Sequence, residues 1–275
     1  MINSDEPILV PRQGIGADCW RITNARLKLA LKYGIGEEGP WRPVESNWSV
    51  AFDTYALRQG PNRGLPTLAD FAVTRLMNSR VGSGDMGRLG LWLSLGINRG
   101  KLKAIQDSLK PLQGLHEAGD DAVRQLGNLI DEMMTEQDGK GQRVLSGIAH
   151  AKIFKWLSAW APAHVPMIDS YVEQALTEME PTSGPLGAGD ILMRFRRLLK
   201  SNLMPLVELG EWLQEHLLSE LPEPLPPVRV LDSLLWCDWW AFWRDGDFKK
   251  WVIPRDKNRT DYELTARGKA LLARL

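Results

Sequence analysis

The sequence predicts an all-α protein with two lobes, and three observations carry that prediction. Apolar residues recur at helical spacing through most of the chain. The connections between these segments are short and contain Gly, Asp, Asn or Pro, as in helical bundles. Hydrophobic residues make up 44% and charged residues 25% of the 275 positions, which is typical of a folded chain with a sizeable core.

Helices are expected to fill the first half of the chain except for one loop. Residues 34–65 are rich in Gly, Pro and Trp and predict an irregular loop, with one short strand at 48–57. Thr67 opens the helix after this loop, because Thr67 and Asp70 stand at the spacing of a capping box. The helices expected in this half cover residues 20–33, 67–79, 84–96, 101–118 and 120–137.

Helices also dominate the second half, with two breaks. Residues 181–189 form a Gly- and Pro-rich turn, and PEPLPP at 222–227 is a stiff connector that a helix does not cross. The tail, 249–275, predicts a small hairpin and a closing helix. The helices expected here cover residues 169–179, 190–203, 205–221 and 228–246.

The predicted helices are assigned to two lobes. Residues 66–162 form a helical bundle, while residues 1–65 and 163–275 together build the second lobe. A cleft between the lobes is the expected place for a substrate.

Charge and cysteine content narrow the class of protein. With 34 basic and 34 acidic residues the net charge is zero, which argues against coating nucleic acid through bulk charge but not against a local basic surface. Two cysteines, Cys19 and Cys237, exclude a disulfide framework, a zinc ribbon and a four-cysteine iron–sulfur cluster. Without a recognisable signal peptide or membrane span, the protein is expected in the cytoplasm.

The segment 145–172 carries the strongest functional signal. It comprises a turn with Gly147, a short helix, a loop bounded by prolines and then a lone acid, Asp169. Gly147 permits a tight turn, and the start of the next helix leaves backbone amides free to bind a phosphate oxygen. The residues expected to hold DNA in this way are Leu145, Gly147, Ile148, Ala149, His150 and Lys152.

This segment resembles the helix-hairpin-helix DNA glycosylase superfamily, which includes endonuclease III and the 8-oxoguanine glycosylases. That family has a hairpin of the form L-P-G-V-G, a helix, and then P-V-D-x-H-V. Its aspartate follows the hairpin leucine at the same separation as Asp169 follows Leu145, which is 24 positions (169 − 145). Pro166, Ile168 and Val172 also match the second half of the pattern.

Departures from the family pattern indicate which activity the resemblance implies. Ser146 replaces the hairpin proline and Ala149 replaces the second glycine. Ala151 occupies the position of the Schiff-base lysine of lyase members, while Lys152 lies one residue later and about 100° round the helix. The resemblance therefore implies a monofunctional glycosylase that leaves an abasic site, with Lys152 as a secondary catalytic candidate.

The resemblance assigns the chemistry to Asp169. A carboxylate beside the anomeric carbon stabilises the sugar cation left by the departing base and orients or deprotonates the attacking water. The implied protein is a monomer that acts on double-stranded DNA, does not bind a membrane, and needs no cofactor beyond a structural monovalent cation at the hairpin. The match is strong over residues 145–172 and weak over 67–81.

Tryptophan is over-represented, with 12 copies, and suggests a pocket for a flipped base. Trp239, Trp240 and Trp243 are the candidate pocket residues. The alternative is that Trp236, Trp240 and Trp243 form the buried face of one helix, since they stand at i, i+4 and i+7. An aromatic pocket would suit a bulky base, such as the modified cytosine of phage DNA, and would make the protein an antiviral glycosylase.

Other interpretations of the same residues stay open. Taken alone, Asp169 is more typical of an ordinary helix N-cap. The hairpin would also serve a binding module that holds DNA without catalysis. The tail at 262–275 looks like the end of a winged helix, as in a transcription regulator, although no recognition helix is evident before it. An unrelated helical scaffold is the remaining alternative.

Overall fold

The computed structural model consists mainly of α-helices and describes residues 8–9, 25–33, 46–77, 80–182, 184, 186–237, 252–254 and 261–273. The helices, in chain order, are α1 (Ala25–Tyr33), α2 (Ser46–Ala56), α3 (Leu68–Val73), α4 (Ser83–Ser94), α5 (Gly96–Leu109), α6 (Asp120–Thr135), α7 (His150–Trp160), α8 (Ser170–Met179), α9 (Ala188–Ser201), α10 (Leu203–His216), α11 (Pro227–Trp236) and α12 (Ala266–Leu272). Short 3-10 turns, η2 (Pro61–Arg63), η3 (Thr74–Met77) and η4 (Leu115–Glu117), complete the helical part. The predicted helical class is confirmed.

One small antiparallel sheet brings together strands from opposite parts of the sequence. Its strands are β1 (Ile8–Leu9), β2 (Val252–Pro254) and β3 (Asp261–Leu264), in the order β1-β3-β2. Ile8 lies opposite Tyr262, and Ile253 lies opposite Glu263. Strands β2 and β3, followed by α12, are the small hairpin and closing helix expected in the tail.

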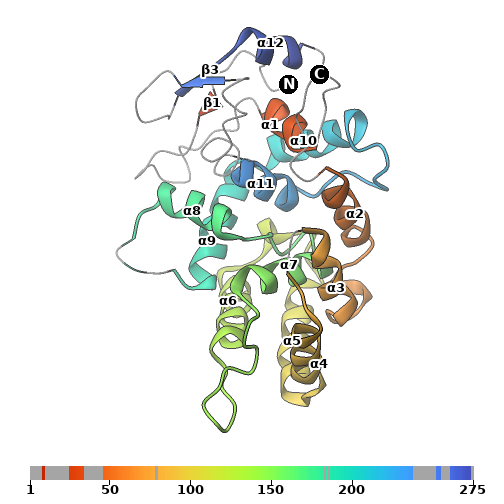
Figure 1. Cartoon of the computed structure of the whole chain (residues 1–275), viewed down its shortest axis with the longest axis vertical. Helices are drawn as coiled ribbons and strands as arrows, with labels where there is room; N and C mark the ends of the chain where they lie inside the picture. Colours follow the sequence, from red (N-terminus) through yellow and green to blue (C-terminus); the bar gives the residue numbers. More distant parts are fainter. Residues whose placement is uncertain are drawn as a thin grey trace.

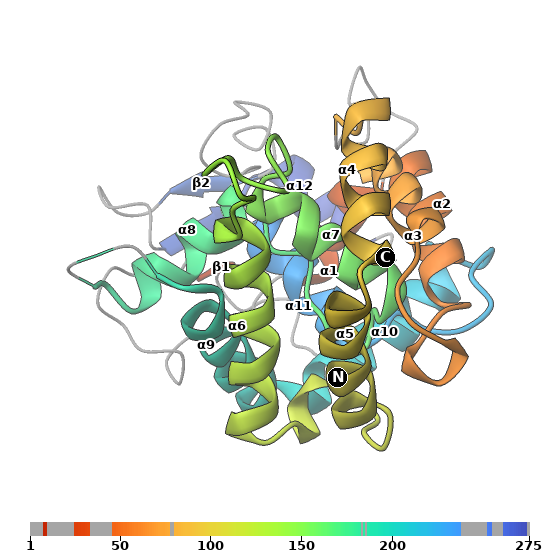
Figure 2. The same ribbon diagram turned by 90° about the horizontal axis from the view of Figure 1, so that it is seen from below.

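Helix α7 has a central place in the fold because it is buried on most of its surface. It packs against α2, α3 and α6, and its side chains from Trp156 to Trp160 are all buried. In Figure 1, α4, α5 and α6 extend toward the lower end, whereas α1, α10 and α12 lie at the upper end. Figure 2 shows α6 running beside α9, the most extensive pairing among the described helices.

One large buried cluster runs through most of the described helices, and a smaller one joins α2 to η3, α7 and the loop before α8. The large cluster includes Leu29 of α1, Phe71 of α3, Leu126 of α6, Phe154 of α7 and Leu231 of α11. The indole nitrogens of two buried tryptophans of α7 donate to backbone carbonyls at the end of the loop before α3: Trp156 to Thr67 (2.8 Å) and Trp160 to Gly64 (2.8 Å). The core therefore draws on segments from both predicted lobes.

The strand expected at 48–57 is wrong, because residues 48–56 belong to α2. Four of them are buried at helical spacing: Ser49, Phe52, Asp53 and Ala56. Two of the four are polar, so the pattern of apolar residues did not reveal the helix. The polar pair is buried because it faces Arg229, as described below.

The capping box expected at Thr67 is confirmed. The Asp70 amide donates to Thr67 Oγ1 (3.4 Å), and the Thr67 amide donates to Asp70 Oδ2 (2.6 Å). The helix it opens is shorter than expected, since α3 ends at Val73 and continues as the 3-10 turn η3.

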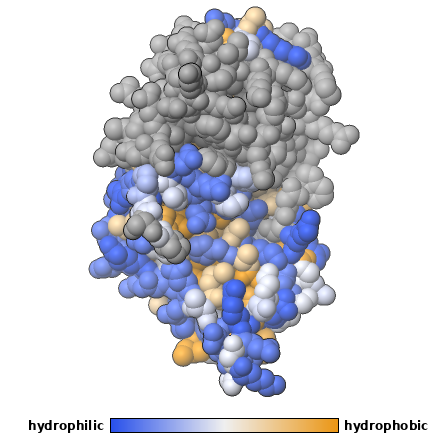
Figure 3. Space-filling model, turned by 60° about the vertical axis from the view of Figure 1, so that its left-hand side comes forward, coloured by the Kyte–Doolittle hydropathy of each residue, from blue (hydrophilic) through white to orange (hydrophobic). Residues whose placement is uncertain are grey.

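The described surface in this view is mainly hydrophilic, with apolar side chains exposed across the middle of the coloured part and near its lower end (Figure 3). The strongly exposed large apolar side chains include Leu91 (65%), Leu95 (44%) and Ile97 (71%). These three surround the junction of α4 and α5. A fourth such side chain, Met204 of α10 (64%), lies elsewhere, so among the described residues three of the four gather at one helix corner.

Candidate functional site: a glycine turn and the Asp169 cavity

Two buried side chains hold the turn that precedes α7 against the core. Leu145 and Ile148 are each 1% exposed, while Ser146, Gly147 and Ala149 are exposed. The Ile148 amide donates to the Leu145 carbonyl (3.0 Å), which closes the turn. Gly147 has φ +82°, a conformation that a side chain would strain. The buried pair therefore fixes a backbone loop that faces solvent.

The turn and the start of α7 present backbone amides without acceptors. Ala149 is the N-cap of α7 in extended conformation and makes no side-chain cap bond. Within the described chain, no acceptor is found for the amides of Gly147, Ala149 or His150. Free amides at a helix start, together with the helix dipole, bind anions. This arrangement suits a phosphate oxygen.

The segment before the turn departs from a simple helix-turn-helix. Helix α6 ends at Thr135, and residues 136–144 form a tight loop in which Gln137 and Arg143 make an isolated antiparallel bridge. Gly141 has φ +75° at the tip of this loop. The turn is therefore separated from α6 by a short finger, which extends at the lower end of the molecule in Figure 1.

An ion cluster ties the turn to α4. Lys152 Nζ donates to Asp85 Oδ2 (3.0 Å) and to the Gly147 carbonyl (3.1 Å), and Arg88 Nη2 contacts Asp85 Oδ1 (2.7 Å). Burial raises the pKa of Asp85, but hydrogen bonds from the Gly82 amide, Lys152 and Arg88 outweigh it and lower the pKa overall. The Lys152 ammonium is thus directed toward Asp85 and the turn.

His150, the first residue of α7, lies beside the turn but faces α6. Its ring packs edge-on against Phe154 with the centroids 4.9 Å apart, and Nε2 lies 3.9 Å from Asp131 Oδ1. Burial lowers the pKa of His150, against the opposing influence of Asp131 and Glu173. The imidazole is therefore mostly neutral at pH 7, so it adds little charge for holding a phosphate.

Asp169 is the N-cap of α8, and only one of its oxygens is used in the cap. Oδ1 accepts from the Tyr171 amide (2.9 Å) and the Val172 amide (3.2 Å). Among the described residues no donor is found for Oδ2. The side chain is half-buried, so the interpretation as an N-cap is confirmed while the second oxygen remains available for another role.

Asp169 lines a small cavity of about 20 Å³, which has room for about one water molecule. The other lining residues come from α1, η3, α7, α11 and the loop before α8: Lys32, Met77, Lys155, Met167, Arg229, Asp232 and Trp236. Lys155 Nζ donates to the Met77 carbonyl (2.7 Å). The cavity thus combines carboxylates and cations from four separate segments.

One wall of this cavity is a buried ion network. Arg229 Nε donates to Asp53 Oδ1 (2.7 Å), and both side chains are 1% exposed. Arg229 also pairs with Asp232, whose Oδ2 accepts from the Met167 amide (3.0 Å). Burial raises the pKa of Asp232, and Arg229 and Lys32 only partly offset this. The network links α2 and α11 to the loop that carries Asp169.

Lys32 and Tyr33 extend the network toward α1. Lys32 Nζ donates to Ser233 Oγ (2.8 Å) and lies 5.4 Å from the ring centroid of Trp236. Burial is the main cause that raises the pKa of Tyr33, so its hydroxyl stays protonated. Trp236 in turn packs edge-on against Tyr171, with the centroids 6.3 Å apart. The aromatic wall of the cavity is therefore held in place from two sides.

The structure separates the sequence-predicted residues into two groups. Leu145, Gly147, Ile148 and Ala149 form the turn together with His150 and Lys152, whereas Asp169 lies at the cavity. Lys152 is not among the residues that line the cavity. Trp239, Trp240 and Trp243 lie outside the described residues, as does Cys19.

Sequence analysis missed most of the residues that share the cavity with Asp169. Lys155 could have been found, since it stands four positions after Ala151 (155 − 151) and so lies on the same face of α7. A lysine inside a helix that is otherwise buried from Ile153 to Trp160 is also a signal. Arg229 and Asp232 stand at the i, i+3 spacing of a helical ion pair, but their contacts with Asp53 and Met167 join segments far apart in the sequence and had no local signal.

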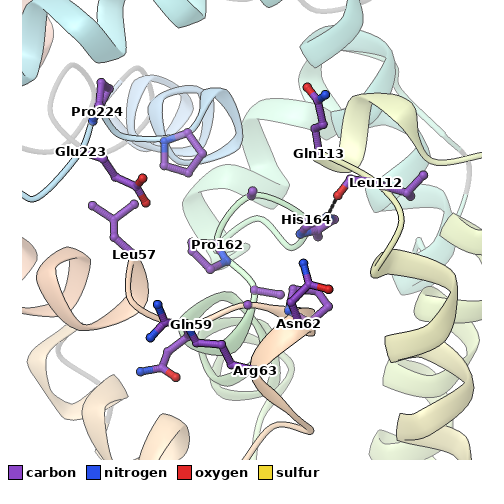
Figure 4. A pocket seen from close by; sticks show the side chains of 15 residues that line it. Leu57, Gln59, Asn62, Arg63, Leu112, Gln113, Pro162, His164, Glu223 and Pro224 are labelled. Atoms are coloured by element: carbon purple, nitrogen blue, oxygen red, sulfur yellow. Dashed lines mark hydrogen bonds between the residues drawn. The ribbon is translucent and has the colours of Figure 1, made fainter.

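A second, larger cavity of about 470 Å³ lies beside the C-terminal end of α7 (Figure 4). His164 lies in its wall and contacts the Leu112 carbonyl through Nε2 (3.0 Å), and burial lowers its pKa. The acid of this cavity, Glu223, is exposed, and much of the lining is proline and amide side chains. Its residues do not bring a carboxylate and a buried cation together, as those of the Asp169 cavity do.

Comparisons with known proteins supply no relative. No protein-family model matches the chain, and no similarity was found to a characterised protein or to a solved structure. Within the described ranges, no cluster of three or more His, Cys, Asp or Glu side chains is placed to hold a metal ion. None of the described helices combines the length and the apolar character that crossing a bilayer requires.

Proposed function

We propose that the protein is a monofunctional DNA glycosylase, which rotates a damaged or modified base out of the duplex and hydrolyses its N-glycosidic bond. The observation that carries the proposal is the state of Asp169. Its Oδ1 is held by two backbone amides, while the carboxylate lines a cavity with room for about one water molecule. A fixed carboxylate beside a water site is what hydrolysis at a sugar carbon requires.

The glycine turn would hold the DNA. In this proposal the turn and α7 act as the hairpin and second helix of a helix-hairpin-helix, and the free amides of Gly147 and Ala149 bind a backbone phosphate. The phosphate contact positions the duplex without reading its sequence. The flipped nucleotide would enter a cleft between two lobes, with Asp169 at its edge.

Asp169 would act on both the sugar and the attacking water. As the base leaves, positive charge develops on the sugar ring, and the carboxylate stabilises that charge. Asp169 Oδ2 then takes a proton from the attacking water, whose oxygen bonds to the anomeric carbon. The products are an abasic site and the free base, and no lysine has to bond to the sugar.

The substrate class follows from the aromatic content of the chain. A chain with 12 tryptophans offers wide flat surfaces for a large base, and Trp236 supplies one such surface at the cavity. A bulky modified cytosine of phage DNA is the substrate that we propose to test first. Excision of such a base would make the protein an antiviral enzyme.

The test compares two Asp-to-Asn variants on duplexes that carry damaged or modified bases and on modified phage DNA. Abasic sites are scored by alkali cleavage. Asp169→Asn should lower the excision rate by roughly 100-fold or more and leave DNA affinity unchanged. Asn is as good an N-cap as Asp, so α8 stays capped. Asp121→Asn, at an exposed acid in the first turn of α6, is the matched control.

The alternative that the turn itself favours is a non-catalytic DNA-binding module. It predicts duplex binding by the wild type without abasic sites on any substrate. It also predicts that binding depends on the turn and not on Asp169. Equal product from the wild type and Asp169→Asn would instead show an activity that does not use this residue.

A further inference from the structure

The two lysines of α7 are directed to different places. Lys152 contacts Asp85 and the Gly147 carbonyl at the turn. Lys155 donates to the Met77 carbonyl and lines the same cavity as Asp169. Only Lys155 therefore brings an α7 amine to the proposed reaction site.

The cavity holds opposite charges on different walls. Arg229 and Asp232 pair with each other and with Asp53 in the buried network. The other charged lining groups are Asp169, at the start of α8, and the two lysines Lys32 and Lys155. A cavity lined by both the Asp169 carboxylate and lysine ammonium groups suits a bond that breaks into a cation and an anion.

We infer that Lys155 is a second catalytic residue, which stabilises and protonates the departing base; this inference rests on the proposed glycosylase function. When the carbon–nitrogen bond breaks, both bonding electrons go to the base. The base anion takes a proton from the Lys155 ammonium, and the attacking water gives a proton to Asp169. Asp169 and Lys155 then exchange one proton with solvent, so the net reaction consumes one water.

The surroundings of Lys155 favour this role over that of a nucleophile. A nucleophilic amine must be neutral, whereas Lys155 donates to the Met77 carbonyl and shares the cavity with the carboxylates of Asp169 and Asp232. The other cations of the cavity have partners of their own, since Ser233 accepts from Lys32 and two carboxylates bind Arg229. The cavity itself is too small for a base, so the base would lie at its mouth, within reach of a long lysine side chain.

The first test measures binding and does not require turnover. The probes are two abasic-analogue duplexes, one with a neutral tetrahydrofuran and one with a cationic pyrrolidine in place of the sugar. Lys155→Met should improve the preference for the pyrrolidine duplex by roughly fivefold to tenfold, because a repelling charge is removed. Asp169→Asn should reduce that preference by a similar factor. Lys155→Arg keeps the charge and should behave as the wild type.

The second test uses the acidity of the leaving base. Single-turnover excision of two modified cytosines that differ only in the electron-withdrawing power of the 5-substituent separates poor from good leaving groups. Lys155→Met should slow excision of the poorer leaving group by about 100-fold and excision of the better one much less. A lysine with a structural role would slow both equally. Lys103→Met, at an exposed lysine of α5, is the control for loss of one lysine.

The outcomes separate this inference from the function on which it rests. The inference alone fails if Lys155→Met changes neither the pyrrolidine preference nor the leaving-group dependence, while the wild type excises bases and Asp169→Asn does not. Trapping of a Lys155–DNA adduct by borohydride would also overturn it, because the amine would then be the nucleophile. If the wild type binds neither duplex, the glycosylase proposal fails together with the inference.

Discussion

Two ion clusters lie beside α7, one at the turn before its first residue and one in the wall of the cavity that Lys155 lines, and they differ in their exposure to water. At the turn, Lys152 and Asp85 keep 17% and 10% of their side-chain surface. In the wall of the cavity, Arg229 and Asp53 keep 1% each. The turn cluster can exchange its contacts with a ligand, whereas the wall cluster cannot lose a partner without leaving a charge buried.

This difference suits the two clusters to different tasks, one in binding and one in positioning reacting groups. A partly hydrated cluster costs little to rearrange and suits contact with a charged, mobile partner such as a phosphate backbone. A sealed network is costly to disturb, and it holds the groups beside it in fixed positions. Asp169 and Lys155 lie against the sealed network, as chemistry at a single carbon atom would require.

The largest effect is expected from breaking the sealed network. Arg229→Met leaves Asp53 and Asp232 buried without their cation, which should destabilise the fold by about 3–5 kcal/mol. Denaturant unfolding of the variant at pH 7 measures this loss. Burial raises the pKa of Asp232 even in the wild type, and loss of Arg229 raises that pKa further.

The pH dependence of Arg229→Met provides the check on this explanation. A carboxyl whose folded-state pKa is raised stabilises the fold at low pH and loses that contribution as pH rises through the folded pKa. The deficit should therefore be smaller near pH 5 than near pH 8. A deficit that does not change with pH would mean that the loss of packing, and not the uncompensated acids, causes the effect.

A smaller effect, confined to the turn, is expected from Gly147→Ala. Its φ of +82° penalises any side chain, and an added Cβ would lie 3.2 Å from Arg88 Nη2. We expect a loss of about 1–2 kcal/mol in the free energy of unfolding, together with weaker DNA binding. Gly141→Ala is the matched control, since Gly141 has φ +75° and nothing within 4 Å of the added carbon. If both variants weaken DNA binding equally, the turn is not the phosphate site.

Local signals in the sequence were sufficient to predict the capping box at Thr67 and the turn before α7. Capping at Thr67, the glycine of the turn and the helix start at His150 depend on residues within a few positions of each other. Such short-range preferences can be read from the chain without knowing its packing. The same holds for Asp169, which starts α8 as an N-cap residue would.

The wall of the cavity could not be predicted in the same way. Its central contact joins Asp53 and Arg229, 176 positions apart, and Asp53 appeared in a predicted strand because a buried acid hides the helical pattern. A buried polar residue and an exposed one look alike in a sequence until the partner is known. Lys155 is an intermediate case. Its position on one face of α7 could be predicted from the sequence, but its place beside Asp169 in the cavity could not.

The smallest effect is expected from a change at Asp85, which should lower the stability of the fold but raise its affinity for DNA. Asp85→Asn removes the charge that Lys152 and Arg88 share, at an expected cost of about 1 kcal/mol at pH 7. The pKa of Asp85 lies below its ordinary value of 3.8, so the wild type has this contribution above about pH 4 and loses it as pH falls through the folded pKa. Denaturation curves of the two proteins should therefore converge toward pH 2.

The released Lys152 and Arg88 would face the turn with one negative charge fewer, so duplex affinity at low salt should rise by about twofold to threefold. Loss of affinity would mean that Asp85 organises the turn for DNA and does not merely neutralise its cations.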